Sequence, residues 1–142
     1  MPALGEAAPQ SLADVQKRIT KDLLGLTGDK VPTPLLQVIQ APVFHGFTVS
    51  LFLDFTEAVT VEALSRALAS EQVDVVGEDG DPPSNLSSAG QGQLLVQLKA
   101  ADETNPNSFS LWIAADNLKL TARTAVACAL ELTRMRPLGK VQ

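Results

Sequence analysis

Histidine and cysteine are the residue types best suited to acid–base and nucleophilic chemistry, and this sequence has one of each. His45 lies in the stretch QAPVFHGFTVSL, beside Gly46 and just before a long apolar segment. An imidazole titrates near neutral pH, which suits a general acid or base. A histidine in this position can equally be a structural residue, so these residues alone leave both interpretations open.

Cys128 lies in the stretch TAVACALEL, which has the composition of a helix interior. The stretch offers no neighbouring cation or base that would activate a thiol, so a small buried cysteine is favoured over a nucleophile. A single cysteine also excludes an internal disulfide framework and fits a reducing compartment.

The remaining candidate motifs are weak. One histidine and one cysteine in distant segments cannot form a zinc site. The stretch AGQGQLL lacks the strand before and the helix after it that a nucleotide fingerprint requires, and no GxSxG elbow is present. An acidic loop lacks the spacing of a calcium-binding EF-hand and reads as a solvated turn; its acidic residues are Asp74, Glu78, Asp79 and Asp81. We therefore expect no catalytic, cofactor-binding or metal site.

Composition and charge limit the class of protein. The chain has 142 residues, 45% hydrophobic and 19% charged, which fits one compact domain with a packed core. Its net charge of -5 makes nucleic acid an unfavourable partner. No signal peptide and no apolar run of membrane-spanning length is recognisable, so we expect a cytoplasmic protein without a membrane partner.

The elements that would position these residues follow from hydrophobic periodicity and turn signals. Helices and strands are mixed without strict alternation, which predicts an α+β domain: a mixed, mostly antiparallel sheet with helices packed on one face. Residues 1–10 are expected to be loose. We expect helices at 11–28 (capped by Ser11), 60–70 (capped by Thr60) and 116–135, a loop at 77–92, and strands at 34–43, 46–55, 72–76, 92–100 and 107–115.

Alternation along the strands places three large apolar side chains on the face opposite the helices. These are Phe52, Leu95 and Trp112, and their neighbours on that face are Thr, Ser, Gln and Lys. Large apolar groups with a polar surround are typical of a protein–protein interface, here a dimer interface. The alternative is that loops or the N-terminal segment cover them.

Three stretches resemble one family in order and spacing over roughly residues 38–120: APVFHGFTVSLFLDF, PPSNLSSAGQGQLLVQL and SFSLWIAADNL. They are similar to the dimerisation domain of the semialdehyde dehydrogenases, most closely the aspartate-semialdehyde dehydrogenases and Usg-type proteins. The matching residues are Pro42, Val43 and Gly46, then Pro83, Leu86, Ala89 and Gly90, then Leu111, Trp112, Asp116, Asn117 and Leu118.

The resemblance implies a glyceraldehyde-3-phosphate dehydrogenase-like C-terminal domain that dimerises through the outer sheet face. Family members also have a Rossmann domain that binds NADP and carries a nucleophilic cysteine, and this chain begins where their second domain begins. The family's substrate-binding arginine and acid–base histidine fall at Gln40 and Phe47, whereas His45 lies on the other side of Gly46. Four further family positions are also changed, to Leu12, Val15, Thr121 and Ala125.

These departures together predict that residues 11–142 form a non-catalytic, stand-alone dimerisation domain. We expect a homodimer, or association with a semialdehyde dehydrogenase-type subunit, and no cofactor. The alternative is an excised C-terminal domain of a full NADP-dependent semialdehyde dehydrogenase of amino-acid biosynthesis.

Overall fold

The computed structural model describes residues 11–41, 43, 45–77, 79–102 and 104–136. The chain divides into two compact units, Met1–Pro42 and Val43–Gln142, and each is considered by itself. The division falls inside the region that the sequence predicts as one domain. Residues 1–10, predicted to be loose, lie outside the described residues.

The first unit contains the predicted N-terminal helix, α1 (Leu12–Thr27). Ser11 caps it as expected, because its side-chain oxygen accepts a hydrogen bond from the backbone N–H of Asp14 at 3.1 Å. Gly28 ends the helix with a φ of 58°, a conformation that glycine adopts without a steric penalty. A short 3-10 turn, η1 (Gly28–Lys30), follows.

The strand predicted at 34–43 does not form in the part of it that the structure describes, residues 34–41 and 43. Residues 32–41 have no regular secondary structure, and no strand of the described chain pairs with them. Pro32 and Pro34 have no backbone N–H to donate to a ladder, which weakens the segment as a strand. Apolar composition without a pairing partner produced this wrong prediction.

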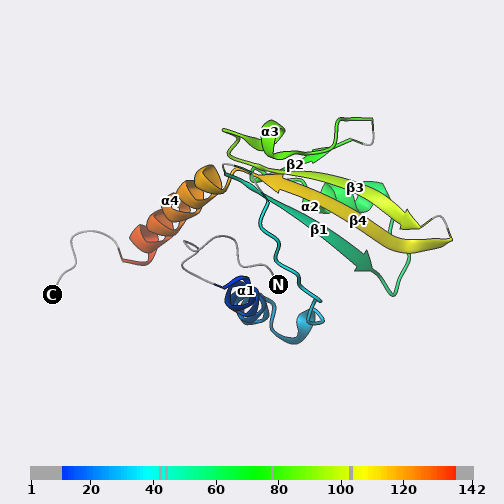
Figure 1. Cartoon of the computed structure of the whole chain (residues 1–142), viewed down its shortest axis with the longest axis horizontal. Helices are drawn as coiled ribbons and strands as arrows, with labels where there is room; N and C mark the ends of the chain where they lie inside the picture. Colours follow the sequence, from blue (N-terminus) through cyan, green and yellow to red (C-terminus); the bar gives the residue numbers. More distant parts are fainter. Residues whose placement is uncertain (1–10, 42, 44, 78, 103, 137–142) are drawn as a thin grey trace. The chain divides into compact units, whose positions relative to one another are not determined.

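The second unit is built on a four-stranded sheet in the order β1-β4-β3-β2, with the strands side by side (Figure 1). These strands are β1 (Phe47–Asp54), β2 (Val73–Val76), β3 (Leu94–Asp102) and β4 (Asn105–Ala115). β4 is antiparallel to both β1 and β3, whereas β2 is parallel to β3. The predicted mixed, mostly antiparallel sheet of an α+β fold is confirmed.

The core lies between the inner face of this sheet and helix α2 (Val61–Leu68). Alternate residues of β3 and β4 are buried there, as the sequence predicts; they are Val96, Leu98, Phe109 and Leu111. Phe55 contacts Phe109 edge to face, with ring centroids 5.9 Å apart. α2 begins at its predicted cap Thr60, and its apolar side chains pack against the core cluster.

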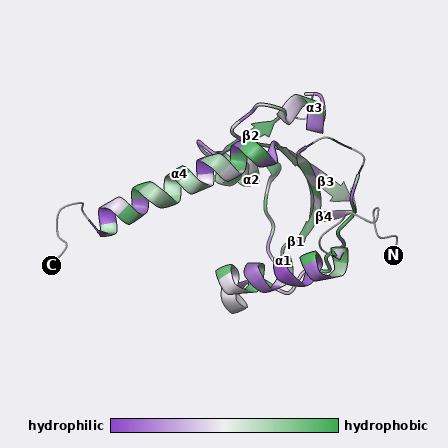
Figure 2. Cartoon of the chain, turned by 60° about the vertical axis from the view of Figure 1, so that its left-hand side comes forward, coloured by the Kyte–Doolittle hydropathy of each residue, from purple (hydrophilic) through white to green (hydrophobic). Residues whose placement is uncertain are grey.

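Of the other two helices of this unit, one was predicted and one was not: the helix expected at 116–135 forms, whereas a short helix was not expected. The loop predicted at 77–92 contains a single helical turn, α3 (Asn85–Ser88), fixed by a capping box between Ser84 and Ser87. Helix α4 (Asn117–Met135) is exposed along its length apart from the half-buried Leu120, and Figure 2 shows apolar and polar residues interspersed along it.

Cys128 is exposed on α4, so the prediction of a buried thiol is wrong. The reason is that a helix-interior sequence fixes the secondary structure but not whether a partner covers the helix. Within the described ranges, no helix has the length and apolar character needed to span a bilayer.

The core predicts how unfolding free energy responds to truncation. Leu111→Ala should lower it by about 2–5 kcal/mol, because Leu111 is only 4% exposed and the lost side chain leaves a cavity. Leu130→Ala is the matched control: Leu130 is 57% exposed on α4, so its truncation should change the free energy by no more than ~0.5 kcal/mol. Urea unfolding followed by circular dichroism measures both. Equal losses would show that Leu111 is not a core residue.

Candidate functional site

Strand register places the three predicted interface residues on a diagonal across the outer face of the sheet. Phe52 of β1 pairs with Ser110 of β4, one row from Trp112 on the same strand. Trp112 pairs with Gln97 of β3, which in turn is one row from Leu95. Diagonal neighbours in a sheet lie roughly 7–8 Å apart, within reach of aromatic side chains. The three side chains therefore form one stripe, which we call the outer stripe.

The outer stripe becomes more exposed toward β1. Phe52 is 75% exposed and Trp112 is 41% exposed, whereas Leu95 is half-buried. The other outward residues of β1 are Thr48, Ser50 and Asp54, all exposed and polar. The uncovered part of the outer stripe thus lies over β1 and β4, with polar groups around it.

The connection between β2 and β3 covers the rest of this face. The indole N–H of Trp112 donates a hydrogen bond to the carbonyl oxygen of Pro83 at 2.6 Å. The side-chain amide of Gln97 donates to the carbonyl oxygen of Gly80 at 3.3 Å. Both Pro83 and Gln97 are buried as a result. The alternative that loops cover the face is therefore realised over β3 and one edge of Trp112, but not over Phe52.

Next to this face, a buried carboxylate joins three segments of the second unit. Asp116 is 4% exposed and follows β4 directly. One oxygen, Oδ1, accepts the backbone N–H groups of Leu118 and Lys119 at 2.9 and 3.0 Å and so caps α4. The other, Oδ2, accepts the backbone N–H of Gly90 at 2.8 Å. One side chain thus fixes the start of α4 and the end of the loop over the sheet.

Asn117 extends this junction to the start of β1. Its side-chain oxygen accepts a hydrogen bond from the backbone N–H of Gly46 at 2.8 Å. Gly46 has a φ of 99°, and a Cβ atom at this position would lie 3.1 Å from the carbonyl oxygen of Ala115. A side chain there would be strained and crowded, which explains the glycine.

The junction brings together the three stretches that carry the family resemblance. The first contributes Gly46, the second Pro83 and Gly90, and the third Trp112 together with the Asp116–Asn117 pair. We call these residues, with His45, the polar junction. Sequence reasoning treated them as separate motif positions; an Asp-Asn pair between a strand and a helix is an N-cap signal that could have indicated the first contact.

His45 lies at the edge of the polar junction. Its Nε2 is 3.5 Å from Oδ2 of Asp116, and its side chain is 40% exposed. The carboxylate it faces already accepts three backbone hydrogen bonds, so its oxygens serve capping and loop attachment. His45 and Asp116 are therefore placed like a histidine–aspartate pair. The hydrogen bonds that Asp116 accepts, however, hold the helix start and the loop in place.

Phe47, at the family's histidine position, belongs to the inner face of β1 with Val49 and Leu51. It pairs with Ala115 of β4 and is 37% exposed. Gln40, at the family's arginine position, is exposed in the irregular segment of the first unit. Neither position thus has the cation or the imidazole that the family resemblance implies there.

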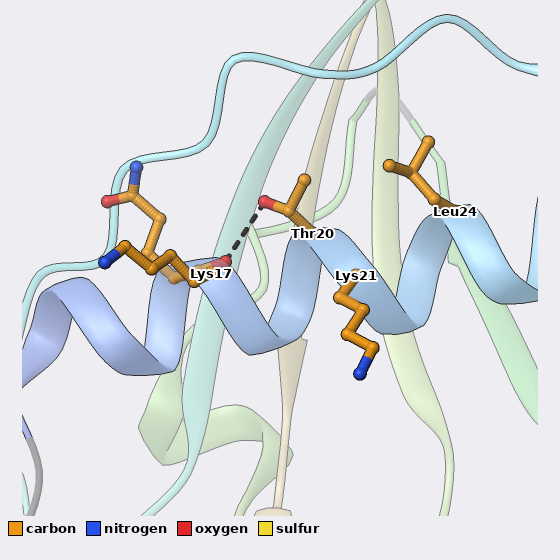
Figure 3. Close-up of a pocket in the computed structure, with 5 residues that line it drawn as sticks. Lys17, Thr20, Lys21 and Leu24 are labelled. Atoms are coloured by element: carbon orange, nitrogen blue, oxygen red, sulfur yellow. Dashed lines mark hydrogen bonds between the residues drawn. The ribbon is translucent and has the colours of Figure 1, made fainter.

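The first unit has a shallow hollow along α1, shown in Figure 3. Its lining comes from that helix alone and consists of Gln16, Lys17, Thr20, Lys21 and Leu24. The hydroxyl of Thr20 donates to the carbonyl oxygen of Gln16 at 3.0 Å, an ordinary contact within a helix. Among the described residues, no group of three or more His, Cys, Asp or Glu side chains could hold a metal ion.

The pKa of Asp116 is lowered, first by the hydrogen bond from Lys119 N–H and next by that from Gly90 N–H; burial opposes the shift. A lowered pKa in the folded state means that the carboxylate stabilises the fold above the pKa of the unfolded chain. This contribution is lost as the pH falls through the folded pKa.

Asp116→Asn should therefore be less stable than the wild type at neutral pH, because an amide cannot accept the same three N–H groups. The difference should shrink as the pH falls below the pKa of an unfolded aspartate and toward the lower pKa of the folded carboxylate. Asp74→Asn, at an exposed position of β2, is the matched control and should be about as stable as the wild type. Urea midpoints measured from pH 7 to pH 3 compare the three proteins; a pH-independent difference for Asp116→Asn would contradict this role.

Comparison with known proteins agrees with this geometry. No protein-family model matches the sequence. A USG-1 protein homolog from Pseudomonas aeruginosa is 31% identical over 118 residues, which are 82% of this chain and 35% of that protein. The structure of a probable aspartate-semialdehyde dehydrogenase from Pseudomonas aeruginosa matches with a TM-score of 0.77 and 28% identity, over 97% of this chain and 41% of that one.

The chain thus spans less than half the length of either relative. Its α+β fold is that of the glyceraldehyde-3-phosphate dehydrogenase-like C-terminal domain expected from the sequence. The residues of the polar junction, the shared fold and these two likenesses lead to one conclusion: the chain is related to the aspartate-semialdehyde dehydrogenases and the USG-1 type proteins.

Proposed function

We propose that this chain is a non-catalytic dimerisation module in which two copies associate through the outer face of the sheet. The observation that carries the proposal is the outer stripe, with Phe52 75% exposed and Trp112 41% exposed on strands whose other faces form the core. Polar and charged side chains surround the stripe, among them Ser50, Asp54 and Lys99, and a polar surround of apolar anchors is typical of interfaces.

The energetics favour association of this kind. Burying an exposed large apolar side chain is worth roughly 1.5–3 kcal/mol before the cost of association is subtracted. A two-fold axis would bring the same diagonal of each copy against the other, so each anchor is used twice. Tryptophan is also the residue type most enriched among interface anchors.

The absence of catalysis is supported by the residues at the family's chemical positions. Gln40 and Phe47 can supply neither a carboxylate-binding cation nor a proton-transfer group. His45 is adjacent to a carboxylate that is committed to backbone contacts. Cys128, the one thiol, lies on the exposed helix α4. An acid–base group has no thiohemiacetal chemistry to assist without a cysteine nucleophile beside it.

One alternative remains open, in which the sequence is part of a full NADP-dependent semialdehyde dehydrogenase. It is favoured by the span of this chain, which covers 41% of the matching dehydrogenase structure. A related possibility keeps the dimerisation role but replaces the second copy with a semialdehyde dehydrogenase-type subunit. We expect either form of the module to work in the cytoplasm.

Trp112→Lys should convert the face-to-face pair into single copies at micromolar concentration, because it places a charge at the centre of the outer stripe. The matched variant Trp112→Phe keeps an apolar ring but loses the hydrogen bond to Pro83. It should retain most of the association. Light scattering gives the assembly size, and circular dichroism checks that secondary structure persists.

If Trp112→Phe dissociates as fully as Trp112→Lys, attachment of the loop at Pro83 controls assembly, and the apolar stripe does not. A wild-type protein that is a single copy at these concentrations removes the premise. Co-purification of a semialdehyde dehydrogenase-type subunit would favour the heteromeric form.

Titration with NADP or NAD should show no saturable binding to this chain at physiological concentrations, and no semialdehyde-dependent reduction of NADP should occur. His45→Ala should leave folding and assembly near the wild type, because the His45 side chain is 40% exposed and Asp116 keeps its three backbone hydrogen-bond donors without it. Calorimetry and absorbance at the nicotinamide band provide the measurements. Turnover that disappears in His45→Ala would overturn the non-catalytic proposal.

A further inference from the structure

The free edge of β1 differs from the other edge of the sheet in ways that bear on self-association. β1 pairs only with β4 among the described strands. It is eight residues long and contains no lysine, arginine, proline or glycine. Natural sheets protect their edges with such residues, with bulges or with very short strands. β2, at the opposite edge, has four residues and carries Asp74 within it.

The one charge of β1 does not guard its edge. Asp54 is the last residue of the strand, and its Oδ1 accepts a hydrogen bond from the Ser108 hydroxyl of β4. Ser108 in turn accepts from the side-chain amide of Asn105 at 2.7 Å. This carboxylate is therefore engaged by the neighbouring strand inside the same sheet.

The register shows which backbone groups face the free edge. The N–H of Phe55 donates to the carbonyl oxygen of Asn107 at 3.0 Å, one step beyond the β1–β4 pairs. Hydrogen-bonded positions alternate along an antiparallel pair, so the odd-numbered residues of β1 direct their backbone groups at β4. Thr48, Ser50 and Phe52 direct theirs outward, and all three are exposed.

We infer that the free edge of β1 is a second self-association surface, on which β1 of another copy pairs antiparallel about a two-fold axis at Ser50. This goes beyond the face-to-face association proposed above. At the free edge of β1, only the even-numbered residues have backbone groups that do not bond to β4. A two-fold axis at Ser50 places even-numbered residues of one copy opposite even-numbered residues of the other. Thr48 then lies opposite Phe52, an aromatic–β-branched pair that stabilises sheets.

Charge and symmetry fit this pairing. With the axis at Ser50, Asp54 lies opposite Gly46, so the two Asp54 side chains are eight residues, roughly 27 Å, apart along the strands. The axis of the edge pairing is perpendicular to the sheet, whereas that of a face-to-face pair is parallel to it. The two interfaces can therefore coexist in a closed tetramer with D2 symmetry.

A cross-linking experiment tests the register. In a Trp112→Lys, Cys128→Ser background, which removes the face association and the native thiol, Ser50→Cys should form a disulfide-linked pair under mild oxidation. The two Cα atoms of such a pair lie about 5.5 Å apart, within the disulfide range. Ser110→Cys on β4 is the control and should remain unlinked, because three strand spacings and an offset of four residues along the strands separate the two copies by roughly 20 Å.

A second measurement tests the interface independently of the register. In the wild type, hydrogen exchange at the amides of Thr48, Ser50 and Phe52 should slow at least tenfold as the concentration is raised through assembly. Ser50→Pro removes one outward N–H and should abolish the edge step in light scattering, whereas Ser50→Ala should keep it.

The outcomes separate cleanly. If the three amides are protected but Ser50→Cys forms no disulfide, the proposed register is wrong. If the amides stay unprotected and Ser50→Pro assembles to the same size as Ser50→Ala, there is no edge interface. Failure of the face-to-face association is read separately, from Trp112→Lys alone, because that substitution lies on the central strand β4. A Ser50→Pro protein that does not fold leaves the amide measurement on the wild type as the deciding result.

Discussion

The buried carboxylate of Asp116 is the contact on which the arrangement of the second unit depends. An ionised group at 4% exposure must have its oxygens satisfied, and it satisfies them with three backbone N–H groups from two different segments. Those bonds fix where β4 ends, where α4 begins and where the loop over the outer face returns to the sheet. Asn117 adds the entry of β1 through Gly46. The same residues carry the resemblance to the aspartate-semialdehyde dehydrogenases seen in the sequence, and their backbone contacts give them a structural role.

This arrangement also determines which part of the outer face is available. The loop is attached at Gly90 by the carboxylate, at Pro83 by the indole of Trp112 and at Gly80 by Gln97. Its path therefore crosses β3 and one side of β4. Among the described residues, β1 has both the exposed phenyl ring of Phe52 and a backbone edge to which no strand is paired. The exposed apolar side chain and the free backbone hydrogen-bonding groups of the sheet are therefore found on the same strand, β1.

Much of this fold could be predicted from the sequence because its strands alternate strictly. Val96, Leu98, Phe109 and Leu111 are inward as expected, and Ser11 and Thr60 cap their helices. The two wrong predictions, a strand at 34–43 and a buried thiol at Cys128, share a cause. Both require a neighbouring segment that pairs with or covers the residues, and the periodicity of a sequence does not show whether such a neighbour exists. The polar junction could be recognised only as separate motif positions, because Gly46, Gly90 and Asp116 are far apart in the chain. Long-range hydrogen bonds of this kind leave no periodic signal in a sequence.

The position of Trp112 has a spectroscopic consequence. The chain has one tryptophan and no tyrosine, so its near-ultraviolet fluorescence comes from a single indole. That indole lies at the centre of the outer stripe, donates a hydrogen bond to Pro83 and is 41% exposed. Its emission wavelength therefore reports the polarity above the sheet, and its quenching by a water-soluble collider reports how much of the face is uncovered. The protein carries its own intrinsic probe of this surface, with no label required.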